Sequence, residues 1–191
     1  MHAIGRFVSL HPQVHVSTDF TDHDVDPVKD GYDLSIRSGQ LDKLGAMVRG
    51  LGLFERAIFV GKGYLADRPK VKHPKALMEW DWINYRHSKR VYQLTSKAGK
   101  TTKLTIRDQS RLQVDNFDAL NTFACLDLGV VVMPIEFAQR GLQEKKLVRL
   151  FDNWHFPKGK YFAVWPDKSY RESLVAVFVD YLTNQLNSDV Q

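Results

Sequence analysis

Several short patterns in this chain place residue types that do chemistry at recognisable spacings. The segment Asp22–Asp26 has carboxylates at the first, third and fifth positions of a calcium-binding loop. However, its sixth position is Pro27, where the sharp turn needs glycine, and its twelfth is Asp33 rather than a bidentate glutamate. We therefore expect no calcium site in this segment.

Two further patterns lack the context that their chemistry requires. Gly99-Lys100-Thr101 matches the end of a phosphate-binding loop, but Leu94 stands where that loop needs its first glycine. His11 and His15 are four residues apart, yet Pro12 ends a helix between them, so the two imidazoles would not share one helical face as metal ligands. We expect surface histidines and no metal site.

Nucleophilic catalysis is not supported either. Ser88, Ser110 and Ser169 have neither the context of a nucleophile elbow nor an obvious order of His and Asp. Cys125, the only cysteine, lies among apolar residues of a predicted helix, which is typical of a buried small hydrophobic residue. The sequence thus predicts a protein that is not an enzyme and has no cofactor.

A binding role is better supported, because one stretch can position polar groups at the end of a strand. Residues 24–31 carry helix punctuation: an Asp cap, a proline in the first turn and a glycine placed to close the helix left-handed. Residues 32–36 then alternate apolar and polar side chains, which predicts a short strand that delivers Arg37, Ser38 and Gly39 to its carboxyl end. Ligands bind at that end in open α/β sheets.

A second stretch has complementary features. Asp115 is the expected cap of the clearest helix in the chain, which closes at Gly129. Residues 130–133 are an uninterrupted apolar run of the buried parallel-strand type, and Pro134 stops it.

The remaining elements predict an α/β protein. A helix over residues 4–10 stops before Pro12, an alternating strand over 14–18 follows, and a helix over 169–186 closes the chain. Because helices and strands alternate, we expect largely parallel sheets. The closing helix presents an apolar stripe of Leu174, Val177, Phe178, Tyr181 and Leu182.

The charge and hydropathy of the chain limit the kinds of partner that it is expected to bind. The formal net charge of the 191 residues is +5, with Lys and Arg interspersed among 22 acidic residues. The densest basic run, Arg86–Arg107, alternates like an exposed hairpin with a turn at Ala98-Gly99, so a solvated face is favoured over a nucleic-acid surface. No window approaches about 18 apolar residues and the start lacks signal-peptide features, so we expect a cytoplasmic location and no membrane contact.

Three stretches in order resemble one family. Residues 25–37, Val-Asp-Pro-Val-Lys-Asp-Gly-Tyr-Asp-Leu-Ser-Ile-Arg, are similar to the "VDLVxEGxDLAIRxG" segment of the effector-binding domain of LysR-type transcriptional regulators. Residues 114–134 are similar to its "xNDxxALxxAxxxGxGIAxLP" segment, and residues 146–182 to its closing part. Each motif alone is weak, but their order and spacing agree over nearly the whole chain.

The resemblance implies a two-lobed periplasmic-binding-protein-like fold of type 2, with an effector cleft between the lobes. The first lobe would comprise residues 1–52 and 160–191, and the second residues 53–159. Two parts of the family pattern have no counterpart in the sequence: the amino-terminal winged helix-turn-helix, and the first strand of the effector domain with the loop that follows it.

The same resemblance implies a function and a set of site residues. The chain would sense a small, carboxylate-type effector, act as a homodimer or tetramer, and reach DNA only through a winged helix-turn-helix absent from this chain. Arg37 and Arg86 would pair with the effector, and amides at the start of the helix after Asn116 would bind its carboxylate. The predicted contacts are Arg37, Ser38, Gly39, Asn84, Arg86, Asn116, Phe117 and Pro134.

Alternatives remain open at this point. A solute-binding protein of a transporter uses the same fold, and an orphan effector domain could dimerise without sensing anything. Arg37 could equally form a structural ion pair with Asp33 or another carboxylate, and Phe117 could simply pack in the core.

Overall fold

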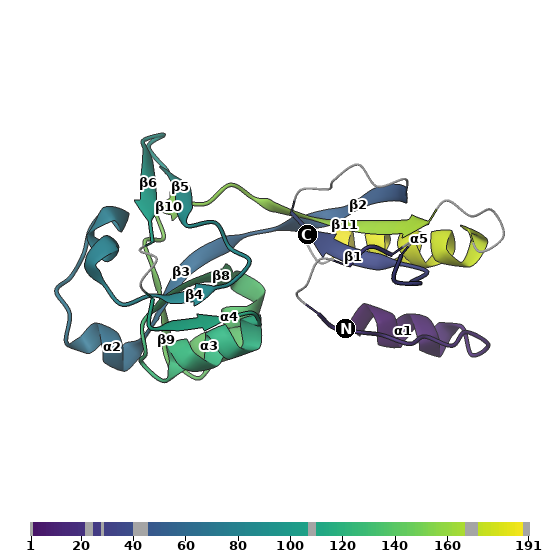
Figure 1. Cartoon of the computed structure of the whole chain (residues 1–191), viewed down its shortest axis with the longest axis horizontal. Coiled ribbons are helices and arrows are strands. Elements are labelled where there is room, and N and C mark those ends of the chain that lie inside the picture. Colours follow the sequence, from purple (N-terminus) through teal and green to yellow (C-terminus); the bar gives the residue numbers. More distant parts are fainter. Residues whose placement is uncertain are drawn as a thin grey trace. The chain divides into compact units, whose positions relative to one another are not determined.

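The computed structural model describes residues 2–21, 25–27, 29–39, 46–106, 110–166 and 172–188. The chain divides into two compact units, which we call unit 1 (Met1–Leu53 with Gly159–Gln191) and unit 2 (Phe54–Lys158) (Figure 1). That the two predicted lobes bind an effector between them stays a prediction.

The described part of unit 1 has one sheet and two helices. Its elements are α1 (His2–Leu10), β1 (Ser35–Ser38), β2 (Ala46–Phe54), β11 (Gly159–Pro166) and α5 (Glu172–Ser188). The sheet order is β1-β11-β2, and β1 runs antiparallel to β11. Phe7 of α1 is buried against Phe178 and Tyr181 of α5, with ring centroids 4.7 and 5.2 Å away, so aromatic packing joins the two helices.

The buried core of unit 1 is small. Among the described residues, it consists of Leu51, Ala163, Trp165, Val179 and Leu182. The stripe predicted for the closing helix is partly wrong, because Leu174 and Val177 are about half exposed while Val179 is fully buried. The helix is rotated relative to the prediction, because its buried face consists of residues 175, 178, 179 and 182.

Two predicted elements near the amino terminus change. The strand expected over residues 14–18 does not form, and these residues have no assigned secondary structure. The helix expected over 24–31 is a single turn in its described part, where Asp30 donates its N–H to the Asp26 carbonyl and Gly31 closes the turn at φ 77°. Asp24, its predicted cap, lies outside the described residues. The strand that follows is β1 (Ser35–Ser38), which begins three residues later than predicted and has Arg37 and Ser38 at its carboxyl end.

Unit 2 contains the larger core. Its elements are β3 (Arg56–Gly61), α2 (Lys62–Ala66), the 3-10 helix η1 (Pro74–Glu79), β4 (Ile83–Tyr85), β5 (Val91–Ser96), β6 (Thr101–Thr105), β7 (Leu112–Val114), α3 (Phe117–Cys125), β8 (Val130–Pro134), α4 (Ile135–Gln143), β9 (Leu147–Leu150) and β10 (Trp154–His155). The predicted hairpin corresponds to β5 and β6, and β10 extends its sheet.

Strand directions in unit 2 correct the expectation of largely parallel sheets. β3 lies between β8 and β9 and is antiparallel to both. β4 pairs in parallel with β7, and a parallel bridge between Trp82 and Val130 connects it to β8. The strands β4, β7, β8 and β9 therefore share one direction, and β3 opposes them. This direction is expected for β7, β8 and β9, which α3 and α4 link in sequence. β3 follows β2 with no helix between them, so no crossover forces it to be parallel.

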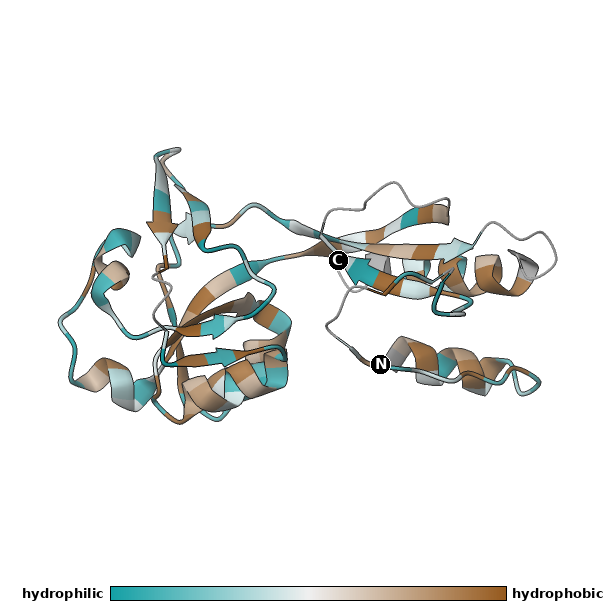
Figure 2. Ribbon diagram, viewed as in Figure 1, coloured by the Kyte–Doolittle hydropathy of each residue, from teal (hydrophilic) through white to brown (hydrophobic). Residues whose placement is uncertain are grey.

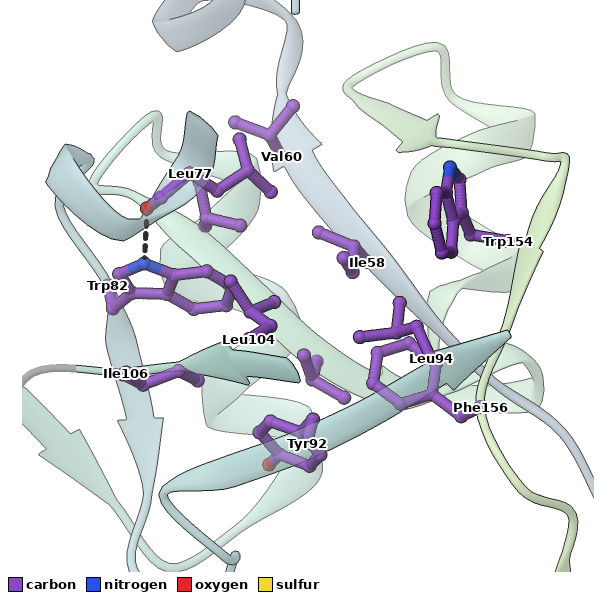
Figure 3. Packing of buried hydrophobic residues seen from close by; sticks show 12 residues of the cluster. Ile58, Val60, Leu77, Trp82, Tyr92, Leu94, Leu104, Ile106, Trp154 and Phe156 are labelled. Atoms are coloured by element: carbon purple, nitrogen blue, oxygen red, sulfur yellow. Dashed lines mark hydrogen bonds between the residues drawn. The ribbon is translucent and has the colours of Figure 1, made fainter. Parts of the chain in front are cut away.

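Both faces of this sheet are covered, which explains the apolar runs in β3 and β8. On β3, Ala57 and Phe59 face the core beneath α3 and α4, whereas Ile58 and Val60 face a second core under η1 and the β5–β6 hairpin. Figure 2 shows the resulting hydrophobic stretch along β3. Figure 3 shows the second core, in which the buried Trp82 indole N–H donates to the Leu77 carbonyl at 2.8 Å.

Asp127 supports α2 from outside that helix. Asp127 has φ 61°, and its carboxylate accepts the Tyr64 backbone N–H at 2.9 Å. Gly61, the residue before α2, has no side chain that could cap the helix. The carboxylate therefore fulfils the capping role from a distant loop, which explains an aspartate at this position.

An exposed charge cluster links α4 to β9 and gives a pH-dependent prediction. Hydrogen bonds from Lys146 and Arg140, both 2.8 Å long, lower the pKa of Glu144 from 4.5 to about 2. Because the pKa is lower in the folded state, this carboxylate stabilises the fold above the ordinary value, and the contribution is lost as the pH falls towards 2. We expect Glu144→Gln to be less stable than wild type at pH 7 and to match it near pH 2, measured by urea unfolding. An unchanged difference at both pH values would contradict the assignment.

Candidate functional site

Three connections of unit 2 converge at one edge of its sheet. Because β4, β7 and β8 point the same way, their carboxyl ends at Tyr85, Val114 and Pro134 lie at the same edge. The backbone N–H of Arg86 donates to the Val114 carbonyl at 2.7 Å, which continues the β4–β7 pairing beyond the strand. We call this region the strand-end edge.

Three aromatic rings stack along the strand-end edge. Phe117 at the start of α3 lies against Tyr85 at the end of β4, with ring centroids 4.3 Å apart and planes at 21°. Phe117 also stacks on Phe137 of α4, at 4.8 Å and 30°. The ring of His87 packs edge-on against Tyr85 at 5.6 Å. Tyr85, Phe117 and Phe137, which we call the aromatic stack, thus join all three connections.

The start of α3 differs in detail from the prediction. Asn116, not Asp115, is the cap: its side-chain oxygen accepts the backbone N–H groups of Asp118 and Ala119 at 2.8 and 3.0 Å. Two of the amides expected to bind a carboxylate are therefore already occupied. Asn116 is exposed, and its amide nitrogen is a further hydrogen-bond donor.

Arg86 provides the positive charge at this edge. Its guanidinium lies 3.4 Å from a carboxylate oxygen of Asp115, and both side chains are about half exposed. That distance exceeds the 2.7–2.9 Å that is typical of a strong charge-assisted hydrogen bond. Arg86 is thus held loosely by Asp115 and remains accessible to solvent.

The other predicted contacts of unit 2 lie deeper. Asn84 is only 4% exposed, in β4 opposite Gln113, so its side chain is buried. Pro134 is buried at the end of β8, and the next residue, Ile135, donates its N–H to the Glu55 carbonyl at 3.0 Å. Contact between either residue and a ligand stays a prediction.

Arg37, Ser38 and Gly39 belong to unit 1. Arg37 and Ser38 are paired with Phe162 and Tyr161 of β11, and Gly39 follows with φ 104°. Ser38 and Gly39 are exposed, whereas Arg37 is half-buried. The structure thus brings together Arg86, Asn116 and Phe117 in unit 2. It places Arg37, Ser38 and Gly39 together in unit 1. Their joint action stays a prediction.

Tyr85 and Phe137 were not predicted from the sequence. Tyr85 is the last residue of a short strand and Phe137 is in the first turn of α4, so each was a single aromatic residue without a motif. A signal was nevertheless present, because both lie within three residues of predicted site positions.

Other kinds of site have little support. Burial raises the pKa of the Cys125 thiol, which disfavours the reactive thiolate. Within the described parts of the chain, no group of three or more His, Cys, Asp or Glu residues could hold a metal ion. No helix built from those residues is long and apolar enough to span a bilayer.

Comparison with known proteins places this geometry in context. The family described as "LysR substrate binding domain" matches residues 1–187. The HTH-type transcriptional regulator PtxR of Pseudomonas aeruginosa is 27% identical over 185 residues, which is 97% of this chain and 59% of that protein. The chain therefore spans about three fifths of the length of this relative.

Solved structures show the same fold. The full-length structure of the Vibrio cholerae virulence activator AphB matches 97% of this chain and 62% of that chain, with a TM-score of 0.80 and 19% identity. The effector domain of the transcriptional regulator AmpR of Pseudomonas aeruginosa matches all of this chain and 92% of that chain, with a TM-score of 0.72 and 15% identity. The predicted α/β fold of the type 2 periplasmic-binding-protein class is thus confirmed.

Proposed function

This chain belongs to the LysR substrate-binding-domain family, and we propose that it is the sensor of a transcriptional regulator and binds a small anionic effector. Relatives such as PtxR are transcriptional regulators and not enzymes, which agrees with the absence of catalytic patterns in the sequence. The strand-end edge of unit 2 carries the proposal. It combines a half-exposed Arg86 with the aromatic stack, so one small surface offers both a positive charge and planar apolar groups.

Arg86 is the proposed anchor for the negative group. Among the described residues, the carboxylate with which an incoming ligand has to compete is Asp115, whose contact with Arg86 is long and exposed to solvent. A bidentate pair between guanidinium and ligand carboxylate would be shorter and stronger. Asn116 is proposed to add a neutral donor through its side-chain amide. Its side-chain oxygen already accepts two backbone N–H groups at the start of α3, so those groups are not free for the ligand.

The aromatic stack suits the non-charged part of an effector. Phe137 is 36% exposed, so the end of the stack is open to contact. Offset stacking or edge-on packing against such rings adds about 0.5–1.5 kcal/mol beyond burial of apolar area. A compact carboxylate with a flat apolar body fits this surface better than a polar dicarboxylate.

Arg37, Ser38 and Gly39 would supply the contacts of the first lobe. On this proposal the two lobes close on the effector, and the change is transmitted through the geometry of a homodimer or tetramer to a DNA-binding region outside this chain, in the cytoplasm. Binding can shift such a regulator only by the difference in affinity between its two arrangements.

A thermal-shift screen with paired ligands tests the proposal. We expect some small carboxylates to raise the melting temperature and their primary amides not to do so, because the amides lack the charge that pairs with Arg86. Arg86→Gln should weaken binding about tenfold, as expected for loss of about 1.4 kcal/mol from a charged hydrogen bond. Phe117→Ala should weaken the aromatic carboxylates more than the aliphatic ones.

Two matched variants control for indirect effects. Arg6→Gln removes the same charge from α1 of unit 1, and Phe123→Ala removes the same ring from α3 at a partly buried position of the unit 2 core. Both should bind as wild type does. Stabilisation by amides as strong as by carboxylates, or equal losses in the control variants, would refute the proposed contacts.

A further inference from the structure

The positive charge of this chain is concentrated in one part of unit 2. Residues 68–106 contain ten Lys and Arg against two acidic residues, a net charge of +8. The rest of the chain contains seventeen Lys and Arg against twenty acidic residues, a net charge of −3. One of the two acids, Asp81, is already paired with Arg68 at 2.9 Å. The whole excess of positive charge therefore comes from a stretch of 39 residues.

The fold gathers lysines from separate parts of this stretch. η1 packs against β6, and Lys75 of η1 and Lys103 of β6 line one hollow of about 300 Å³. Gln93, Thr101 and Thr102 complete its lining, so it has hydroxyl and amide groups and no carboxylate. The two lysines and the neighbouring polar groups make this hollow attractive to anions.

The hairpin extends this surface towards its tip. Gln93 pairs with Lys103 and Thr95 with Thr101 across the two strands, and the exposed residues of β6 alternate with buried ones. Lys97 and Lys100 flank the turn and are exposed, as is Lys72 just before η1. We call Lys75, Lys97, Lys100 and Lys103 the basic face.

The basic face rests on a rigid support. Leu94 and Leu104, from the inner side of the hairpin, and Leu77 of η1 are at most 1% exposed in the core drawn in Figure 3. The strands are paired over five consecutive positions from Val91 to Thr95. A fixed array of lysines loses less conformational freedom on binding than lysines on a mobile loop.

The sequence alone favoured a solvated hairpin over a nucleic-acid surface, but the fold adds Lys75 of η1 beside Lys103. We propose that the basic face binds the phosphate backbone of duplex DNA without reading its sequence. Lysines with neighbouring hydroxyl and amide groups are suited to phosphate contacts. The solvent-facing positions of the hairpin contain no aromatic ring on which single-stranded bases could stack. An acidic protein partner fits less well, because protein interfaces are centred on apolar or aromatic anchors and the hollow has none. None of the basic-face lysines belongs to the proposed effector site at the strand-end edge, so either proposal can fail while the other stands.

Fluorescence anisotropy with a random-sequence duplex of about 30 base pairs tests the proposal. We expect binding at about 50 mM salt that weakens steeply as salt rises, with a slope of about −0.9 for each phosphate contacted. Lys75→Glu with Lys103→Glu should reduce affinity at least tenfold and make the salt slope shallower by about 2. Lys97→Glu with Lys100→Glu, at the exposed turn, should act in the same way and provides a second pair if the first disturbs folding.

The matched control reverses two exposed lysines in unit 1, Lys29 and Lys160. Lys29→Glu with Lys160→Glu changes the net charge equally and should leave affinity within about threefold. Equal losses in the control would mean that total charge, not the basic face, decides binding. Failure to bind the duplex at low salt would overturn the proposal, and so would polyglutamate displacing the duplex at equal charge concentration.

Discussion

Replacing Phe59 with alanine is expected to reduce the free energy of unfolding of unit 2 by about 3–5 kcal/mol. Phe59 is fully buried on β3, between β8 and β9, and its ring lies in the core beneath α3 and α4. Its removal leaves a cavity that strands on both sides prevent from closing. Because that core also supports the start of α3, the aromatic stack should loosen as well.

Urea unfolding followed by tryptophan fluorescence measures the loss, since Trp80, Trp82 and Trp154 report on unit 2. Phe20→Ala is the matched control, because the same ring is 71% exposed at position 20. That variant should change stability by no more than about 0.5 kcal/mol. A loss below about 1 kcal/mol for Phe59→Ala would show that β3 is not central to the core.

Gly129→Ala is expected to cost about 3 kcal/mol or more, through backbone strain and a direct clash. Gly129 has φ 151°, a conformation that residues with a side chain rarely adopt. A Cβ atom there would lie 2.6 Å from the Asp81 carbonyl oxygen. That oxygen cannot retreat easily, because it accepts the Val130 N–H at 2.8 Å where β4 meets β8.

The Gly99→Ala variant distinguishes the cost of backbone strain from the cost of the clash. Gly99 also has a positive φ, 78°, but a Cβ atom there would meet nothing within 4 Å. It should therefore cost only the strain of a left-handed residue, about 1–2 kcal/mol. Thermal or urea unfolding compares the two variants. Equal losses would mean that the close approach at Gly129 contributes nothing to stability.

Most elements could be predicted because local signals determine them. The run over residues 130–133 has no alternation, and the structure explains why: neighbouring residues of β8 face two different cores. Its strand direction relative to β3 could not be predicted, because pairing between distant segments leaves no local pattern. The strand expected over 14–18 failed for a related reason, since an alternating segment forms a strand only when a neighbouring strand pairs with it.

The candidate site was predictable only in part. Arg86, Asn116 and Phe117 follow directly from the rule that ligands bind where parallel strands end, and the structure brings them together. Asn84 was predicted to contact the effector; the structure buries it to 4% exposure in β4, and its contact with a ligand stays a prediction. Tyr85 and Phe137 become meaningful only through the stack with Phe117, which tertiary packing creates.

Amide NMR shifts on titration with the most stabilising carboxylate of the thermal-shift screen test the central claim most directly. We expect the largest shift changes in unit 2 at Arg86, Asn116, Phe117 and Phe137. The corresponding primary amide should produce no shift changes at these residues. In Arg86→Gln the same changes should require about tenfold more ligand. Shift changes confined to residues away from the strand-end edge, or unaltered titration of Arg86→Gln, would contradict the account.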